Sequence, residues 1–309
     1  MVINTGQRTD IPAFYSKWFM NRIREGYVLV RNPYHPEQIT RYELRPDVVD
    51  CIGFCTKDPS PMIPHLDEIK DFGQLWFVTV TPYGREVEPN VPQKGKVISS
   101  FISLSEKVGI KSVAWRYDPI FITEKYSIKQ HIADFSAIAK RLSGHTEVCV
   151  ISFIDLYEKV KRNFPEARTV SPRERAEIGE AFAKIGKEYG IKIKTCAEGT
   201  DLEKYGIDCS GCQTKETIEN AIGARLKVPS SKRSPRAECS CLIGTDIGAY
   251  DTCAHLCRYC YANANKDNVV RNARLHDPSS PLLLGNLRGG EEIHSAFQES
   301  WIDRQQTFL

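Results

Sequence analysis

The sequence predicts an α/β fold of the TIM-type (β/α) barrel class, complete or incomplete, followed by a cysteine-rich segment. Two observations predict it. Short apolar runs rich in β-branched residues alternate with helical patterns, which is typical of repeated βα units around a parallel sheet. Charged and ligand-type side chains recur directly after these runs, where the strands of such a barrel end in loops. In this chain of 309 residues, we expect residues 1–235 to form the barrel and residues 236–309 to form the cysteine-rich segment and tail.

The predicted strands are short apolar runs bounded by polar residues, glycine or proline. Seven of them occur along the chain, at Val2–Ile3, Tyr27–Val30, Val48–Phe54, Leu75–Val80, Val113–Trp115, Val148–Phe153 and Ile191–Ile193. A complete barrel needs eight strands. Only the weak candidate Arg225–Val228 is available for the eighth, so an open or incomplete barrel is the alternative.

The predicted helices between these strands have start and stop signals. The clearest one begins with the capping box Ser171 to Glu174, has proline at its first position, and stops at Gly190. Another repeats apolar side chains at helical spacing and stops before a glycine. We predict helices over Asp10–Glu25, Ser127–Leu142, Ser171–Tyr189 and Thr214–Ile222.

Two pairs of charged residues at strand exits are candidate catalytic or binding residues. Arg8 and Asp10 follow the first predicted strand, and Arg116 and Asp118 follow the fifth. Arginine and carboxylate groups on a barrel rim are suited to binding a ligand that carries a carboxylate. Structural ion pairing around the barrel mouth is the alternative.

Composition narrows the class of protein. The net charge of +3 indicates no particular partner, and the basic stretch 230–236 is short, so we expect no nucleic-acid partner. No run of about 20 apolar residues predicts a membrane span. The first residues lack the basic flank and apolar core of a signal peptide, so we expect a cytoplasmic protein. Thiols stay reduced there, so the clustering among the 11 cysteines indicates metal binding rather than disulfides.

The densest cysteine cluster lies near the C-terminus. Cys253, Cys257 and Cys260 are separated by three residues and then by two. Thiolates are soft ligands that select iron–sulfur clusters or zinc. A [4Fe–4S] cluster held by three cysteines leaves one iron without a protein ligand, so another molecule can bind there.

This spacing, with Tyr259 just before the last cysteine, resembles the cluster motif of radical S-adenosylmethionine (SAM) enzymes. The runs from Asn4 to Tyr15 and from Cys239 to Asn263 resemble a bacterial family of barrel proteins of unknown function, whose C-terminal cysteines are likened to that motif. The resemblance implies a [4Fe–4S] cluster, SAM bound to its open iron, and a reductant such as ferredoxin or flavodoxin. It leaves the substrate, a small molecule or a peptide, unidentified.

In radical SAM enzymes the motif follows the first barrel strand, whereas here it follows most of the chain. A C-terminal segment that folds back over the barrel mouth would restore the geometry. The alternatives to a radical SAM-type enzyme are an iron–sulfur redox protein that does not use SAM, and a zinc-stapled binding module.

A second group of cysteines is predicted to hold another centre. Five cysteines, at positions 196, 209, 212, 239 and 241, lie in one window of 46 residues, and four of them could hold this centre. The family resemblance favours Cys196, Cys212, Cys239 and Cys241 as the ligands. Four cysteines suit either structural zinc or an auxiliary iron–sulfur cluster. In the alternative, Cys239 or Cys241 completes the first cluster and closes its open iron.

Overall fold

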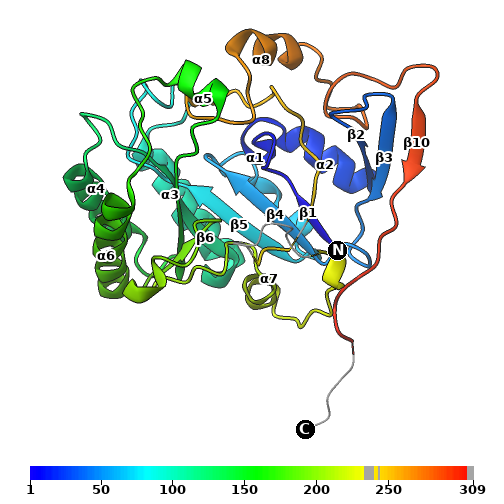
Figure 1. Cartoon of the computed structure of the whole chain (residues 1–309). Coiled ribbons are helices and arrows are strands. Elements are labelled where there is room, and N and C mark those ends of the chain that lie inside the picture. Colours follow the sequence, from blue (N-terminus) through cyan, green and yellow to red (C-terminus); the bar gives the residue numbers. More distant parts are fainter. Residues whose placement is uncertain (233–239, 243, 305–309) are drawn as a thin grey trace.

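The computed structural model describes residues 1–232, 240–242 and 244–304, and its centre is a seven-stranded sheet (Figure 1). The strand order is β8-β7-β6-β5-β4-β1-β9, and every neighbouring pair is parallel. All carboxyl ends of the strands therefore lie at one edge of the sheet. The strands are β1 (Val2–Asn4), β4 (Cys51–Thr56), β5 (Gln74–Thr79), β6 (Val113–Ile120), β7 (Val148–Phe153), β8 (Lys192–Thr195) and β9 (Thr245–Asp246).

The sheet is open, with β8 and β9 as its edge strands in the described part of the chain. The α/β prediction is confirmed, but the closed form of the barrel is not. The weak candidate for an eighth strand, Arg225–Val228, does not join the sheet, because this run makes only an isolated bridge between Leu226 and Ile302. The place beside β1 is taken by β9, which is too short and polar to be recognised as a strand in the sequence.

The second predicted barrel strand belongs to a separate small sheet. β2 (Tyr27–Arg31) pairs antiparallel with β3 (Gln38–Glu43), and β10 (Glu292–Ser295) pairs parallel with β3. The short connection 32–37 has no room for a helical crossover, so β2 and β3 form a hairpin rather than a parallel unit. Placing Tyr27–Val30 in the barrel was therefore wrong.

The helices follow their sequence signals where those signals are local. Ser171 and Glu174 form the predicted capping box, and Gly190 ends that helix in the left-handed conformation. The helix predicted over Asp10–Glu25 is broken at Tyr15. The α-helices are α1 (Ile11–Phe14), α2 (Ser16–Glu25), α3 (Lys94–Val108), α4 (Ile128–Leu142), α5 (Glu158–Asn163), α6 (Pro172–Tyr189), α7 (Lys215–Ile222) and α8 (Lys266–Ala273), and short 3₁₀ turns lie at Ile63–Ile69, Ile110–Ser112, Glu203–Tyr205 and Ser230–Lys232.

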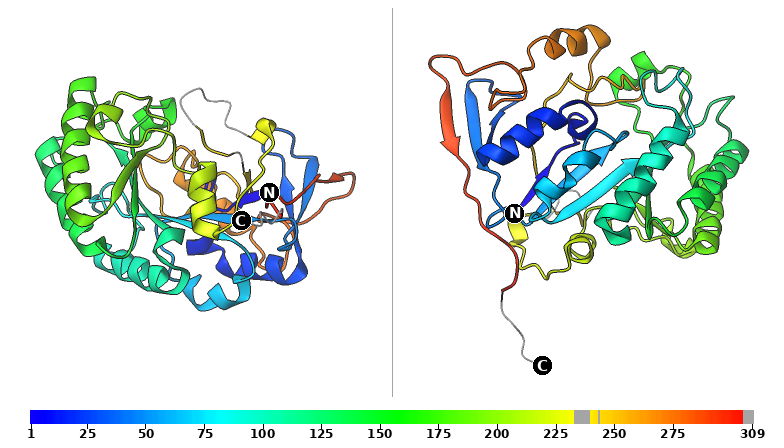
Figure 2. Two further views of the ribbon diagram at one scale, coloured as in Figure 1. Left: turned by 90° about the horizontal axis from the view of Figure 1, so that it is seen from below. Right: turned by 180° about the vertical axis from the view of Figure 1, so that it is seen from behind.

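The two faces of the sheet have different environments. Figure 2 shows the sheet as an arc with α3, α4 and α6 along its outer side and α7 on its inner side. The outer face carries the main aromatic core, which includes Trp76 and Trp115. The inner face is apolar near the amino ends of the strands, where Phe77 packs with Ile218 of α7. Toward the carboxyl edge, polar side chains such as Arg116 on β6 take over.

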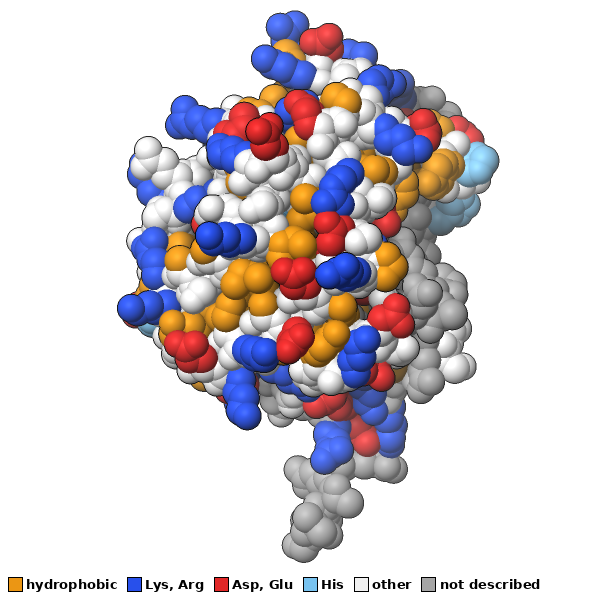
Figure 3. Space-filling model, turned by 60° about the vertical axis from the view of Figure 1, so that its left-hand side comes forward, with side chains coloured by type: hydrophobic (Ala, Val, Ile, Leu, Met, Phe, Trp, Pro, Cys, Tyr) orange, Lys and Arg blue, Asp and Glu red, His pale blue; other side chains and the backbone are white. Residues whose placement is uncertain are grey.

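Two surface properties bear on partners. None of the described helices is long and apolar enough to cross a membrane. Basic and acidic side chains are interspersed over the face shown in Figure 3, and no large area there carries one sign of charge.

Candidate functional site

The cysteine loop, which we define as residues 251–263, lies against the loop that follows β5 at the carboxyl edge of the sheet. The backbone N–H of Asn90 donates to the carbonyl of His255 (3.2 Å), and its side-chain amide donates to the carbonyl of Ala254 (2.8 Å). The N–H of Arg258 donates to the carbonyl of Val87 (2.9 Å). The C-terminal segment therefore folds back over the strand ends.

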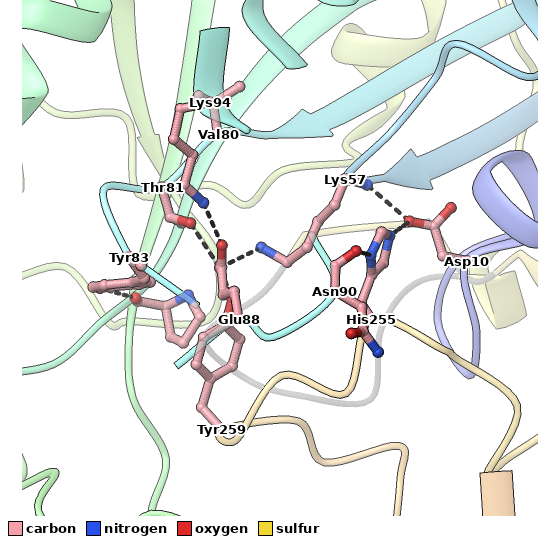
Figure 4. A network of polar contacts seen from close by, with 12 residues as sticks. Asp10, Lys57, Val80, Thr81, Tyr83, Glu88, Asn90, Lys94, His255 and Tyr259 are labelled. Atoms are coloured by element: carbon pink, nitrogen blue, oxygen red, sulfur yellow. Dashed lines mark hydrogen bonds and ion pairs between the residues drawn. The ribbon is translucent and has the colours of Figure 1, made fainter. Parts of the chain in front are cut away.

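A buried carboxylate fastens this loop to the sheet (Figure 4). Glu88, 1% exposed, accepts hydrogen bonds from Lys57 Nζ (2.8 Å), Lys94 Nζ, Thr81 Oγ1 (2.7 Å) and the hydroxyl of Tyr259. Burial alone would raise the pKa of Glu88, but the charges of Lys57 and Lys94 outweigh it and lower the pKa to about 2. The network joins the exits of β4 and β5 and the start of α3 to the cysteine loop.

Asp10, which follows β1, is a second residue that anchors the cysteine loop. Its carboxylate caps α1 by accepting from the N–H of Ala13 (3.0 Å), and it also accepts from the N–H of Lys57 (2.8 Å). Nε2 of His255, inside the cysteine loop, lies 3.0 Å from the same carboxylate. The structure thus gives Asp10 a positioning role beneath the cysteine loop.

The three cysteines of this loop are partly buried free thiols. Burial raises the pKa of Cys253 well above its ordinary value, and the neighbouring Asp10, Cys260 and Cys257 raise it further. Burial also raises the pKa of Cys257 to about 12, although Lys57 opposes the shift. Without a metal these thiols are neutral at neutral pH, so a metal that binds here must displace their protons.

The chemistry of the loop fits a thiolate-bound metal group. The N–H of Ala262 points at Cys260 Sγ (3.3 Å), as backbone donors do around metal thiolates. The side chain of Asn263 donates to the carbonyl of Cys253 (2.8 Å), while its buried Oδ1 has no partner. In the described residues, no set of three or more Cys, His, Asp or Glu side chains is already arranged to hold a metal ion. Binding therefore requires the thiols to turn toward a common centre.

The two arginines predicted as rim residues are both ion-paired. Arg8 Nε lies 2.6 Å from Asp246 Oδ2, which ties the exit of β1 to β9. Arg116 Nε lies 3.0 Å from Asp118 Oδ2, and Asp118 also accepts from the hydroxyl of Ser152. Arg8 therefore matches the structural alternative, whereas the second pair lies among polar side chains on the inner face.

Arg116 lies near the second group of cysteines and interacts with Tyr261 of the cysteine loop. Burial opposes its charge, but Asp118 and the nearby Cys55, Cys196 and Cys212 raise the pKa of Arg116 well above its ordinary value. Burial raises the pKa of Tyr261 on the cysteine loop, and this residue interacts with Cys55, Cys260 and, more weakly, Arg116. Tyr261 could not be predicted as a site residue, since a single tyrosine after a cysteine is not a motif.

The second group of cysteines comes together in part. Cys212 Sγ lies 3.6 Å from Cys196 Sγ and 3.7 Å from Cys241 Sγ. The thiol of Cys209 instead donates to the carbonyl of Ile207 (3.8 Å). Cys239 and the basic linker residues 233–236 lie outside the described residues.

Comparisons with known proteins identify a family but no activity. No curated protein matches this chain. Among solved structures, a putative alpha-L-fucosidase from Bacteroides thetaiotaomicron VPI-5482 matches at 14% identity and a TM-score of 0.29, over 64% of this chain and 58% of that one. The chain thus spans less than two thirds of that structure, and this likeness carries no functional argument.

The family match takes in most of the described fold. Residues 2–262 match the family described as "Domain of unknown function (DUF1848)", and this range runs from β1 through Cys260. The chain therefore belongs to the DUF1848 family, as its resemblance to a barrel family of unknown function predicted.

Proposed function

We propose that this protein is an iron–sulfur enzyme of radical SAM type, in which Cys253, Cys257 and Cys260 hold a [4Fe–4S] cluster with one open iron. The observation that supports it most is that these three thiols share one loop at the carboxyl edge of a parallel sheet, where α/β proteins place ligands and active groups. When bound there, the cluster and SAM supply the electron and the radical chemistry that the protein itself lacks.

The surrounding residues hold and shield this centre. Glu88 binds Tyr259 and Asp10 binds His255, so the backbone that carries the three thiols is held in place at two points. Lys57 Nζ lies 5.6 Å from the ring centre of Tyr259, and Tyr259 lies between Cys257 and Cys260 in the sequence. Its positive charge favours the thiolate forms that metal binding requires.

The inner face below the cysteine loop is the proposed substrate side. Arg116, Asp118 and Ser152 form a hydrogen-bonded set there that can orient polar groups of a small molecule or a peptide. The double variant Arg116→Ala/Asp118→Ala removes both charges together, so no buried charge is left without a partner. We expect it to keep its iron and to lose at least tenfold in SAM cleavage, measured as methionine release; unchanged release contradicts the assignment.

The chemistry implies a reductant such as ferredoxin or flavodoxin and a reducing, cytoplasmic environment. The ten described cysteines are all free thiols, which suits such an environment.

The cluster assignment is tested by counting iron and acid-labile sulfide in anaerobically purified variants. Cys257→Ser should lose the cluster, whereas Cys149→Ser, a change at a buried thiol in the outer core, should retain it. Equal iron in both variants would contradict the assignment. A cluster that is present but indifferent to SAM would instead support the redox protein.

A further inference from the structure

The second group of cysteines is assembled from three distant parts of the chain. Cys196 directly follows β8, Cys212 precedes α7, and Cys241 precedes β9. Their sulfurs meet at Cys212, with contacts of 3.6 Å and 3.7 Å to the other two. Residues so far apart in sequence do not meet through local chain geometry, so the fold itself brings these thiols together.

A backbone donor beside these thiols favours a metal-bound thiolate. The backbone N–H of Gln213 donates to Cys241 Sγ (3.2 Å), a contact that stabilises a thiolate more than a neutral thiol. Such a donor suits a sulfur that gives up its proton to a metal.

We propose that Cys196, Cys212 and Cys241 bind a zinc ion that is separate from the cluster of the cysteine loop. Tetrahedral Zn²⁺ with Zn–S bonds of about 2.3 Å holds its sulfurs about 3.8 Å apart, and both measured contacts lie close to that value. In a [4Fe–4S] cluster each thiolate binds a different iron, which holds the sulfurs further apart. In a [2Fe–2S] cluster each iron takes only two thiolates, so two short contacts to the same sulfur fit a single ion better.

Zinc binding here requires a small movement and the loss of protons. No described group of this kind already surrounds an ion, so the outer two thiols must turn toward a common centre beside Cys212. Their protons leave as the Zn–S bonds form. A fourth ligand, from water or from outside these three side chains, completes the tetrahedron.

This position gives the ion a structural role. β8 and β9 are the two edge strands of the sheet in the described part of the chain, and the ion would join the segment after β8 to the segment before β9. The intervening chain already makes isolated bridges toward both sides, between Lys194 and Asp208 and between Thr214 and Cys241. Coordination bonds would therefore hold together the segments beside the two edge strands, which no strand pairing joins in the described part of the chain.

The test is a count of zinc and iron in the full-length protein, purified without oxygen from zinc-replete medium. Wild type should hold one zinc besides its iron, and Cys212→Ser should lose that zinc while its iron stays unchanged. Cys209→Ser is the matched control, because this thiol is close in sequence but bonded to the Ile207 carbonyl, and it should keep the zinc. Replacing zinc with Co²⁺ should give the intense visible absorption of a tetrahedral thiolate site.

Three results would overturn the zinc proposal: no zinc in wild type, equal zinc in the two variants, or iron and sulfide lost from Cys212→Ser in place of zinc. If Cys212→Ser is insoluble, wild-type protein is treated with a chelator and then titrated with Zn²⁺. Recovery of one equivalent together with a higher melting temperature supports the site, and no saturable uptake refutes it. Because zinc and iron are counted separately, failure here is distinct from failure of the cluster proposal.

Discussion

Replacing Glu88 with glutamine should destabilise the protein strongly, because it removes a buried charge that two lysines need. Breaking a buried ion pair by removing one partner costs about 3–5 kcal/mol. The pKa gives a similar figure: about 2 in place of 4.5 corresponds to about 3 kcal/mol. We expect the free energy of unfolding to fall by about 3 kcal/mol, measured by urea denaturation at pH 7.

Glu86→Gln is the matched control. The pKa of Glu86 is also lowered to about 2, first by Lys125 and then by Tyr126, but its side chain is about half exposed. Solvent screens such a pair, so this variant should lose less than about 1 kcal/mol. Equal losses in the two variants would refute the argument that burial makes the Glu88 network strong.

The pH dependence gives an independent check on Glu88. Because its pKa is lower in the folded state, its stabilisation is present above pH 4.5 and is lost as the pH falls toward about 2. Acid unfolding of Glu88→Gln should therefore be shallower over this range than that of wild type. Curves of identical slope would contradict the assigned pKa.

Three further predictions concern single side chains. Arg8→Met leaves Asp246 buried and unpaired, so urea denaturation should show a loss of about 3 kcal/mol with iron content unchanged. Burial lowers the pKa of His131, so wild-type stability should fall as the pH drops below 6.5, and a melting series of His131→Gln should lack that component. Lys57→Met removes a positive charge beside the cysteine loop, so a redox titration followed by electron paramagnetic resonance should show a lower cluster reduction potential; an equal or higher value would contradict this.

Sequence patterns predicted the parts of the fold that depend on local chemistry. The capping box at Ser171, the glycine stop at Gly190 and all seven strand positions correspond to observed elements, and six of these strands lie in the main sheet. The remaining strand, Tyr27–Val30, pairs with β3 in the small sheet, because the short connection 32–37 allows only a hairpin. β9 could not be predicted, because two polar residues become a strand only when β1 is beside them.

The site was predictable where it consists of a motif and not where it consists of long-range contacts. The spacing of the cysteines indicated the loop, and the family match includes its three cysteines. Glu88 carries no sequence signal, since it lies in a loop, 31 residues from Lys57 and 171 residues from Tyr259. Arg8 and Asp10 were noticed for their position after a strand, but only the structure shows that their charges are used internally.

The central claim, an open iron on a cluster held by the cysteine loop, is tested most directly by electron paramagnetic resonance. The protein is purified without oxygen, reduced with dithionite, and measured before and after SAM is added. We predict a [4Fe–4S]⁺ signal that shifts when SAM binds. A signal that does not change with SAM would contradict the open iron, and protein that contains zinc but no iron would contradict the cluster itself.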